Sequence, residues 1–243
     1  MNTVDLLAEI LKREGVEYLS CFPTTPVIES AAAAGIRPII CRQERVGVGI
    51  ADGYSRVHNG SKVGVFAMQS GPGAENAYAG VATAYSDSTP ILLLPTGHPR
   101  ERQGVLPHFN SVTNFAGVTK YIEQINTAGR TTDVMRRAFA GIYQGRPGPV
   151  MVEIPSDVAL EEVPEEAIHW GKNFPNLGSA GNPKDVESAA HALVTARYPV
   201  IHAGQGVLYA DASDELVELA ELLSIPVMTT LLGKSAFPET HPL

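Results

Sequence analysis

The sequence of 243 residues predicts an α/β fold in which a doubly wound, mainly parallel sheet carries helices on both faces. Apolar stretches of strand length alternate with stretches of helical spacing, which is typical of parallel βαβ units. The apolar run at 90–95 shows no period of two, as expected of a strand whose two faces are both covered. Further strand-and-helix repeats after residue 183 predict a second, incomplete α/β domain.

The first elements are defined by their start and stop residues. Leucines and an isoleucine at helical spacing predict a helix at 3–13, which Gly15 ends. A strand is expected at 18–21. The threonine before Pro26 is expected to cap a helix at 26–34, because proline suits the first helical position.

The rest of the first domain follows the same pattern, with glycine-containing turns between apolar runs and helices rich in small residues. The expected strands are 37–41, 62–68, 90–95, 120–125 and 150–154, and the expected helices are 44–57, 74–88 and 131–143. The stretch 96–118 is expected to be a long irregular loop, which at that length is more often functional than idle.

The helix at 44–57 contains Gly47 and Gly49, each of which costs about 1 kcal/mol relative to alanine inside a helix. We therefore expect another helix, a second subunit or a ligand to pack very close to this helix.

The predicted boundaries give a first domain at 1–160, a linker at 161–182 and a second domain at 183–243. The linker is acidic and aperiodic and contains proline and glycine. The second domain is expected to contain helices at 184–197 and 213–224, strands at 199–203 and 226–230, and a turn at 204–206. These elements are too few to cover both faces of a sheet, so the second domain is expected to be cut short.

The composition excludes several classes of partner and site. There are 18 basic and 26 acidic residues, a net charge of −8, and no basic cluster, which argues against nucleic acid or an anionic membrane as partner. No apolar stretch approaches bilayer length and no secretion signal is seen at the start, so a cytoplasmic location is expected by default. Cys21 and Cys41 fit neither a metal site nor a disulfide framework and are expected to be buried thiols.

Three features carry candidate chemistry on residue type. The Ser-Gly-Pro-Gly turn at 70–73 is either a site for an anionic or polar group at a helix start, or a tight turn alone. Glu44, between a strand and a helix, is either a solvated charge that suits the helix dipole or a functional carboxylate. His98 and His108 are loop histidines, either exposed polar residues or substrate contacts.

Five sequence blocks, in this order, resemble the pyrimidine-binding domain of thiamine-diphosphate enzymes of the acetolactate synthase group. They are RQE at 42–44, ADGYSR at 51–56, QSGPGAEN at 69–76, ATAYSDSTP at 82–90 and GRPGPV at 145–150. The tail, with AGQG at 203–206 and LGKSAFPETHP at 232–242, is similar to the start of the central domain of that family.

The resemblance implies a catalytic role for Glu44, whose family counterpart hydrogen-bonds the aminopyrimidine ring and thereby helps to remove a proton from the thiazolium carbon. It also implies two groups of binding residues. The cofactor-binding candidates are Pro23, Thr24, Ser70, Gly71, Pro72, Gly73 and Asn76, and the substrate-loop candidates are Thr25, His98, Phe109 and Asn110.

The implied function is decarboxylation of a pyruvate-like 2-keto acid and transfer of the acyl carbanion to a second carbonyl compound, in a homodimer or homotetramer. A 2-keto acid decarboxylase or acyltransferase on the same scaffold is the alternative among enzymes. The alternative from another class is a non-catalytic or split-subunit fragment that needs a partner with the diphosphate-binding domain.

The sequence departs from the family pattern at three places and lacks one of the family's signatures. Pro23-Thr24-Thr25 stands where glycines usually follow the proline, His98 stands in place of a glutamine, and Phe109-Asn110 replaces a Phe-Gln pair. The Gly-Asp-Gly…Asn signature for diphosphate and Mg²⁺ does not occur, so the chain is expected to contain no metal site. We expect the Mg²⁺ ligands in a separate C-terminal domain and the isolated chain to be inactive, and leave any need for FAD open.

Overall fold

The computed structural model describes residues 1–23, 25–170 and 179–243. The chain divides into two compact units, Met1–Asn176 and Leu177–Leu243, which are described separately. Of the predicted features, Thr24 and the 171–178 part of the linker lie outside the described residues.

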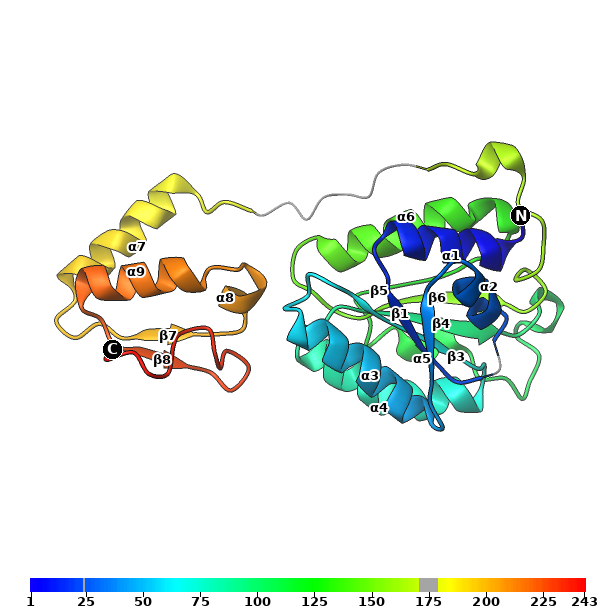
Figure 1. Cartoon of the computed structure of the whole chain (residues 1–243), viewed down its shortest axis with the longest axis horizontal. Coiled ribbons are helices and arrows are strands. Elements are labelled where there is room, and N and C mark those ends of the chain that lie inside the picture. Colours follow the sequence, from blue (N-terminus) through cyan, green and yellow to red (C-terminus); the bar gives the residue numbers. More distant parts are fainter. Residues whose placement is uncertain (24, 171–178) are drawn as a thin grey trace. The chain divides into compact units, whose positions relative to one another are not determined.

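The first unit is built on a parallel sheet of six strands in the order β2-β1-β3-β4-β6-β5 (Figure 1). The strands are β1 (Tyr18–Cys21), β2 (Arg37–Ile40), β3 (Gly64–Met68), β4 (Ile91–Gly97), β5 (Tyr121–Gln124) and β6 (Val150–Pro155). All residues of β3 and β6 are buried, which explains why the central strands are apolar without alternation.

Helices cover both faces of this sheet, which confirms the predicted doubly wound α/β fold (Figure 1). One face carries α1 (Thr3–Arg13), α2 (Val27–Ala33) and α6 (Thr131–Tyr143), and the other carries α3 (Glu44–Val57), α4 (Pro72–Ser86) and the short α5 (Ser111–Phe115). Alternate residues of β3 serve the two cores, since Val65 packs with the first group of helices and Phe66 with the second.

The chain changes direction across the sheet between β1 and β3. β1 leads through α2 to β2 on one face, whereas β3 leads through α4 to β4 on the other. Ligands of such sheets bind outside the carboxyl ends of the strands at this reversal. The segments that follow β1, β2 and β3 therefore border the first place to look for a site.

Helix α3 packs unusually close to its neighbours because glycines remove the side chains between them. A Cβ atom on Gly47 would lie 2.2 Å from Phe66 Cε2, and one on Gly64 would lie 2.0 Å from the carbonyl oxygen of Ala51. The expected close packing is thus found at Gly47, but its neighbour is the sheet and not the helix, subunit or ligand that the sequence suggested. Gly49 faces open space in the described part of the chain, so a second subunit or a ligand against it stays a prediction.

Two local predictions are corrected by the structure. Pro26 itself occupies the N-cap position of α2, and the buried Thr25 hydroxyl makes no capping hydrogen bond. The stretch 96–118 is not wholly irregular, because it contains a 3₁₀ turn at Arg100–Arg102 and helix α5. Asn110 starts α5 by accepting a hydrogen bond from Thr113 N at 2.9 Å.

Both cysteines are free and buried, as predicted. Burial is the main reason that the pKa of Cys21 rises to about 11, so its thiol stays protonated and unreactive at neutral pH. Neither thiol is a nucleophile candidate.

Part of the predicted linker packs on the first unit. Val163 is buried and donates its backbone N–H to the Met1 carbonyl, and Glu162 forms an antiparallel bridge with Asn2. The predicted boundaries at 160 and 183 stay predictions.

The second unit is a small parallel sheet of two strands, β7 (Ile201–Ala203) and β8 (Val227–Thr229). Its helices are α7 (Pro183–Thr195), α8 (Gly206–Tyr209) and α9 (Ser213–Leu223). The predicted turn at 204–206 therefore leads directly into a short helix. Tyr198, Leu222 and Leu231 are at least 77% exposed, as expected of a sheet with too few neighbours.

The two α3 glycines give a matched test of this packing. We expect Gly47→Ala to lower the free energy of unfolding by about 1–3 kcal/mol, because the new methyl group collides with Phe66 and overpacks the core. Gly49→Ala should instead raise it by about 0.5–1 kcal/mol, because alanine favours the helix and meets no neighbour. Urea unfolding of the three proteins measures both; equal effects of the two substitutions would contradict the close-packing account.

Candidate active site

Glu44 is a buried carboxylate at the start of α3, with only 7% of its surface exposed. Its Oε2 accepts a hydrogen bond of 2.8 Å from Asn76 Nδ2, in the first turns of α4. Its Oε1 lies over Gly73, where an added Cβ would come within 3.0 Å. Glu44 therefore points against the beginning of a neighbouring helix. It is not a solvated charge at a helix start, which was the other interpretation of the sequence.

The turn before α4 requires glycine. Gly71 has a φ of +62°, a conformation that side chains disfavour, and Pro72 then occupies the first helical position. Gly71 and Gly73 are buried, Ser70 is half-buried and Pro72 is exposed. At Gly73 the turn thus presents bare backbone to the Glu44 carboxylate.

The turn after β1 carries a buried polar group. Thr25 is buried, and its Oγ1 has no hydrogen-bond partner among the described residues. A buried hydroxyl without a partner lowers stability, so such a group is often satisfied by a ligand or by water. Pro23, on the same turn, is exposed.

The remaining substrate-loop candidates divide between two roles. Phe109 packs edge-on against Phe115 at 6.4 Å between ring centroids and so belongs to the hydrophobic core. His98 and His108 are both half-buried, and their rings meet at 4.4 Å. With Asn110 they line a pocket of about 190 Å³ whose lining does not include Glu44.

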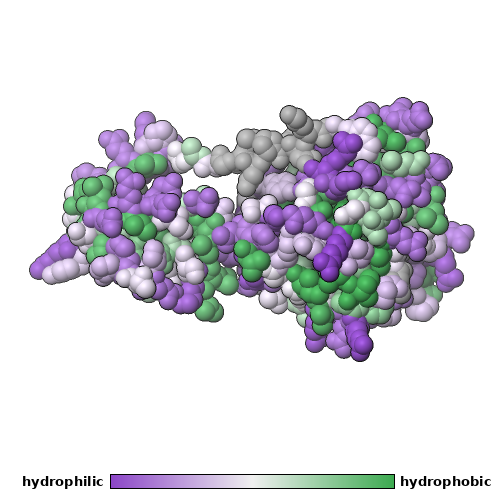
Figure 2. Space-filling view, in the orientation of Figure 1, coloured by the Kyte–Doolittle hydropathy of each residue, from purple (hydrophilic) through white to green (hydrophobic). Residues whose placement is uncertain are grey.

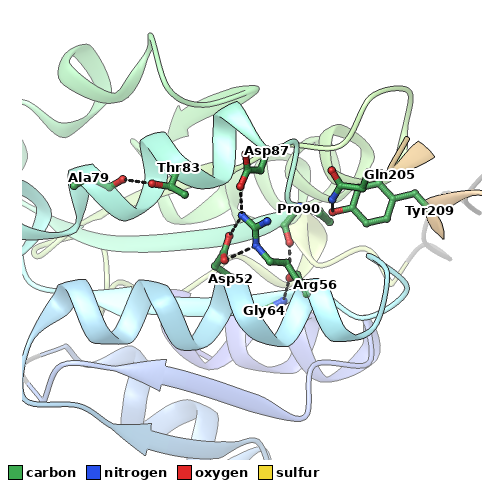
Figure 3. A network of polar contacts seen from close by, with 10 residues as sticks. Asp52, Arg56, Gly64, Ala79, Thr83, Asp87, Pro90, Gln205 and Tyr209 are labelled. Atoms are coloured by element: carbon green, nitrogen blue, oxygen red, sulfur yellow. Dashed lines mark hydrogen bonds and ion pairs between the residues drawn. The ribbon is translucent and has the colours of Figure 1, made fainter. Parts of the chain in front are cut away.

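A polar network that the sequence reading did not single out links α3 to α4 (Figure 3). The Arg56 guanidinium donates to Asp52, one turn earlier on α3, and to Asp87 at the end of α4. Asp52 is 2.6 Å and Asp87 is 2.8 Å from it. These residues belong to two of the five family-like blocks, and that membership was the one sequence feature that could have pointed to them. Only the fold shows that the two blocks are in contact.

A bridging hydroxyl also fixes the same end of α3. Ser55 Oγ donates to the Pro90 carbonyl at 2.6 Å and accepts from Gly64 N at 2.8 Å. Pro90 and Gly64 are labelled beside the Arg56 network in Figure 3. Arg146 donates to Ser88 Oγ at 2.7 Å and so attaches the GRPGPV block to this region. Three of the five blocks therefore brace the helices, while the other two form the Glu44 site.

Other classes of site are not seen in the described part of the chain. No group of three or more His, Cys, Asp or Glu side chains is placed to hold a metal ion within residues 1–23, 25–170 and 179–243. Within the same residues, no helix has the length and apolar character needed to cross a bilayer.

Comparison with known proteins agrees with this geometry. Residues 1–128 match the model of the N-terminal TPP binding domain of thiamine pyrophosphate enzymes, and residues 186–243 match the model of their central domain. The chain belongs to the thiamine pyrophosphate enzyme family. The resemblance found in the five blocks is thereby confirmed, and thiamine diphosphate is the cofactor of the family.

The similar proteins with assigned names include synthases and a carboligase. The chain is 34% identical over 255 residues to a probable acetolactate synthase large subunit of Methanococcus aeolicus, covering 100% of this chain and 42% of the relative. It is 34% identical to an acetolactate synthase of Arthrospira platensis, covering 98% and 43%. It is 32% identical to a glyoxylate carboligase of Escherichia coli O157:H7, covering 100% and 42%. The chain thus spans about two fifths of the length of these relatives.

The hydrogen bond between Asn76 and Glu44 can be tested without a ligand. We expect Asn76→Asp to lower the free energy of unfolding by about 1–3 kcal/mol at pH 7, because it replaces a donor by a second carboxylate beside a buried one.

The loss should shrink as the pH falls through the carboxylate range, because a protonated aspartic acid can donate again. Denaturant unfolding at several pH values makes the measurement, with Asn76→Ala as the control that removes the donor without adding charge. A loss that does not depend on pH would show that the two groups do not interact.

Proposed function

We propose that this chain supplies the pyrimidine-binding part of an acetolactate synthase-like enzyme, which decarboxylates a pyruvate-like 2-keto acid and joins the acyl group to a second carbonyl compound. The observation that carries the proposal is the buried Glu44 carboxylate, held by Asn76 near the start of α4 at the carboxyl edge of the sheet. Membership of the thiamine pyrophosphate family supplies the matching cofactor.

The residues around Glu44 fit an aminopyrimidine ring. The ring needs a carboxylate that can share a proton with one of its nitrogens, and a surface free of side chains for close approach. Glu44 offers the carboxylate, and Gly71 and Gly73 keep the neighbouring turn bare. The unpartnered Thr25 hydroxyl adds a polar group on the adjacent turn, and Pro23, Thr24, Ser70 and Pro72 complete the proposed contacts.

Each of these residues has a definable task. Glu44 holds or releases a proton at its carboxylate, and burial strengthens its hydrogen bonds by excluding water. Asn76 fixes the orientation of that carboxylate by donating to Oε2, so that Oε1 is the oxygen left for a ligand. Thiamine diphosphate, when bound, supplies a carbon acid that can stabilise negative charge after decarboxylation.

The proposal extends to the groups that bind elsewhere. The diphosphate and its Mg²⁺ are assigned to oxygen ligands of a further domain, as the family resemblance implies. Carboligation is preferred to simple decarboxylation because similar proteins are named acetolactate synthase and glyoxylate carboligase. The proposal includes a cytoplasmic location and does not include FAD.

A homodimer or homotetramer is part of the same proposal. Val46 and Ile50 on α3 and Tyr78 and Tyr85 on α4 are 37–51% exposed, beside the open Gly49. Figure 2 shows green, hydrophobic residues on the lower part of the larger unit, the side on which Figure 1 draws α3 and α4. Such a face, on helices that are already packed closely, supports a contact between subunits.

The role of Glu44 predicts a specific kinetic defect. In the holoenzyme, with this chain complemented by the diphosphate-binding domain, Glu44→Gln should slow hydrogen–deuterium exchange at the thiazolium carbon by about 10²–10⁴-fold, because a neutral amide cannot act as an acid or base. Quenched-flow exchange followed by NMR of the cofactor makes the measurement.

Glu75→Gln is the matched control, because Glu75 is exposed on the first turn of α4 and should leave the exchange rate unchanged. An unaltered rate in Glu44→Gln, with cofactor bound, would refute the assigned role.

A further inference from the structure

A second polar pocket lies at the carboxyl edge of the sheet, around β4, β5 and β6. It has a volume of about 190 Å³, and its polar lining consists of His98, Gln103, His108, Asn110, Gln124 and Glu153. His98 directly follows β4, Gln124 ends β5, and Glu153 lies in the second half of β6. A water molecule occupies about 30 Å³ in the liquid, so the pocket suits a molecule of a few heavy atoms.

Glu153 gives this pocket its charge. The residue is only 7% exposed, and its carboxylate packs against Gly97, where an added Cβ would lie 3.0 Å from Glu153 Cδ. Glu153 Oε1 accepts a hydrogen bond from Gln124 Nε2, and Gln124 Oε1 accepts one from Gln103 Nε2 at 2.8 Å. The relay fixes the first carboxylate oxygen through neutral groups alone.

The second oxygen, Oε2, is left for a donor. No salt bridge to Glu153 occurs within residues 1–23, 25–170 and 179–243. Arg100, on the loop that borders the pocket, pairs with Asp157 and Glu161 instead. A buried carboxylate with one free oxygen favours a ligand that donates O–H, and disfavours a second anion.

The two histidines complete a donor and acceptor set. Their rings meet at 4.4 Å in a T-shaped arrangement, and neither makes a hydrogen bond with another described residue. Each neutral imidazole can donate one hydrogen bond and accept another. They can therefore bind the hydroxyl and carbonyl groups of a small ligand beside the Glu153 carboxylate.

We infer that this pocket receives a small, neutral hydroxy-carbonyl compound as the acceptor of the acyl group, and that it disfavours a second 2-keto acid anion. This inference rests on the proposed function. The reaction balances without oxidant or reductant: the donor loses its carboxylate as CO₂, a carbon–carbon bond forms to the acceptor carbonyl carbon, and the carbonyl oxygen takes one proton from solvent. Glu153 acts as a selectivity residue through its charge.

Direct binding to the chain tests the inference without turnover. Dihydroxyacetone serves as the neutral probe and pyruvate as the anionic one, and NMR of the imidazole Cε1–H resonances reports on His98 and His108. The resonances are assigned with His98→Gln and His108→Gln. We expect dihydroxyacetone to shift both resonances at millimolar concentration, and pyruvate to shift them at least tenfold more weakly.

Glu153→Gln keeps the shape of the side chain and removes its charge. It should weaken dihydroxyacetone binding by about tenfold, the range expected when a hydrogen bond to a charged group becomes neutral. The substitution should also reduce the ratio by which the pocket prefers dihydroxyacetone to pyruvate. Glu101→Gln, an exposed residue of the same loop outside the pocket lining, is the matched control and should bind both probes as the unmodified chain does.

Equal or tighter binding of pyruvate, or no shift with either probe, would overturn the inference, and both results come from the unmodified chain. The proposed function is judged separately by thiazolium exchange in Glu44→Gln. If exchange depends on Glu44 while dihydroxyacetone fails to bind, only the acceptor assignment fails. If dihydroxyacetone binds as expected while exchange is independent of Glu44, the pocket stands as a binding site and its role as acceptor site fails.

Discussion

The site depends on how closely α3 packs on the sheet and on α4. Gly47 removes the side chain that would separate α3 from Phe66, and Gly80 does the same between α4 and Val48, where an added Cβ would lie 2.3 Å from Cγ1. Ser20 Oγ bonds the Gly47 carbonyl at 2.9 Å and so holds the helix at this distance. Glu44, the first residue of α3, is thereby brought over the start of α4.

The two ends of α3 differ in how many side-chain contacts hold them. At its carboxyl end, Arg56 and Ser55 join α3 to α4 and to the strands through a charged pair and a bridging hydroxyl. At its amino end, Glu44 has only Asn76 as its side-chain partner in the described residues. The bracing is concentrated where no ligand is proposed, so the opposite end keeps polar groups for binding. A similar division between scaffold and site is common in sheets that bind ligands at their carboxyl edge.

The carboxyl edge carries two buried carboxylates in different surroundings. Glu44 is held by an amide donor beside a bare turn, which suits proton exchange with a flat ring. Glu153 is held by a chain of glutamine amides beside two imidazoles, which suits recognition of hydroxyl groups. In both cases a neutral donor satisfies one oxygen, and no salt bridge to the carboxylate occurs among the described residues. The charge therefore remains available to a ligand.

The sequence alone determined the α/β class, most element positions and the family, because apolar periodicity, glycine turns and the five motif blocks are local in the chain. It also indicated that α3 packs closely, but not against what. Only the tertiary structure showed that Gly47 faces Phe66 and Gly49 faces open space, that Asn76 reaches Glu44, and that Glu153 shares a pocket with His98 and His108. Glu44 and Asn76 are 32 positions apart in the chain, and Glu153 and His98 are 55 apart. Strand order and crossover direction bring such distant residues together and decide which face of a helix is covered. No local sequence pattern encodes either.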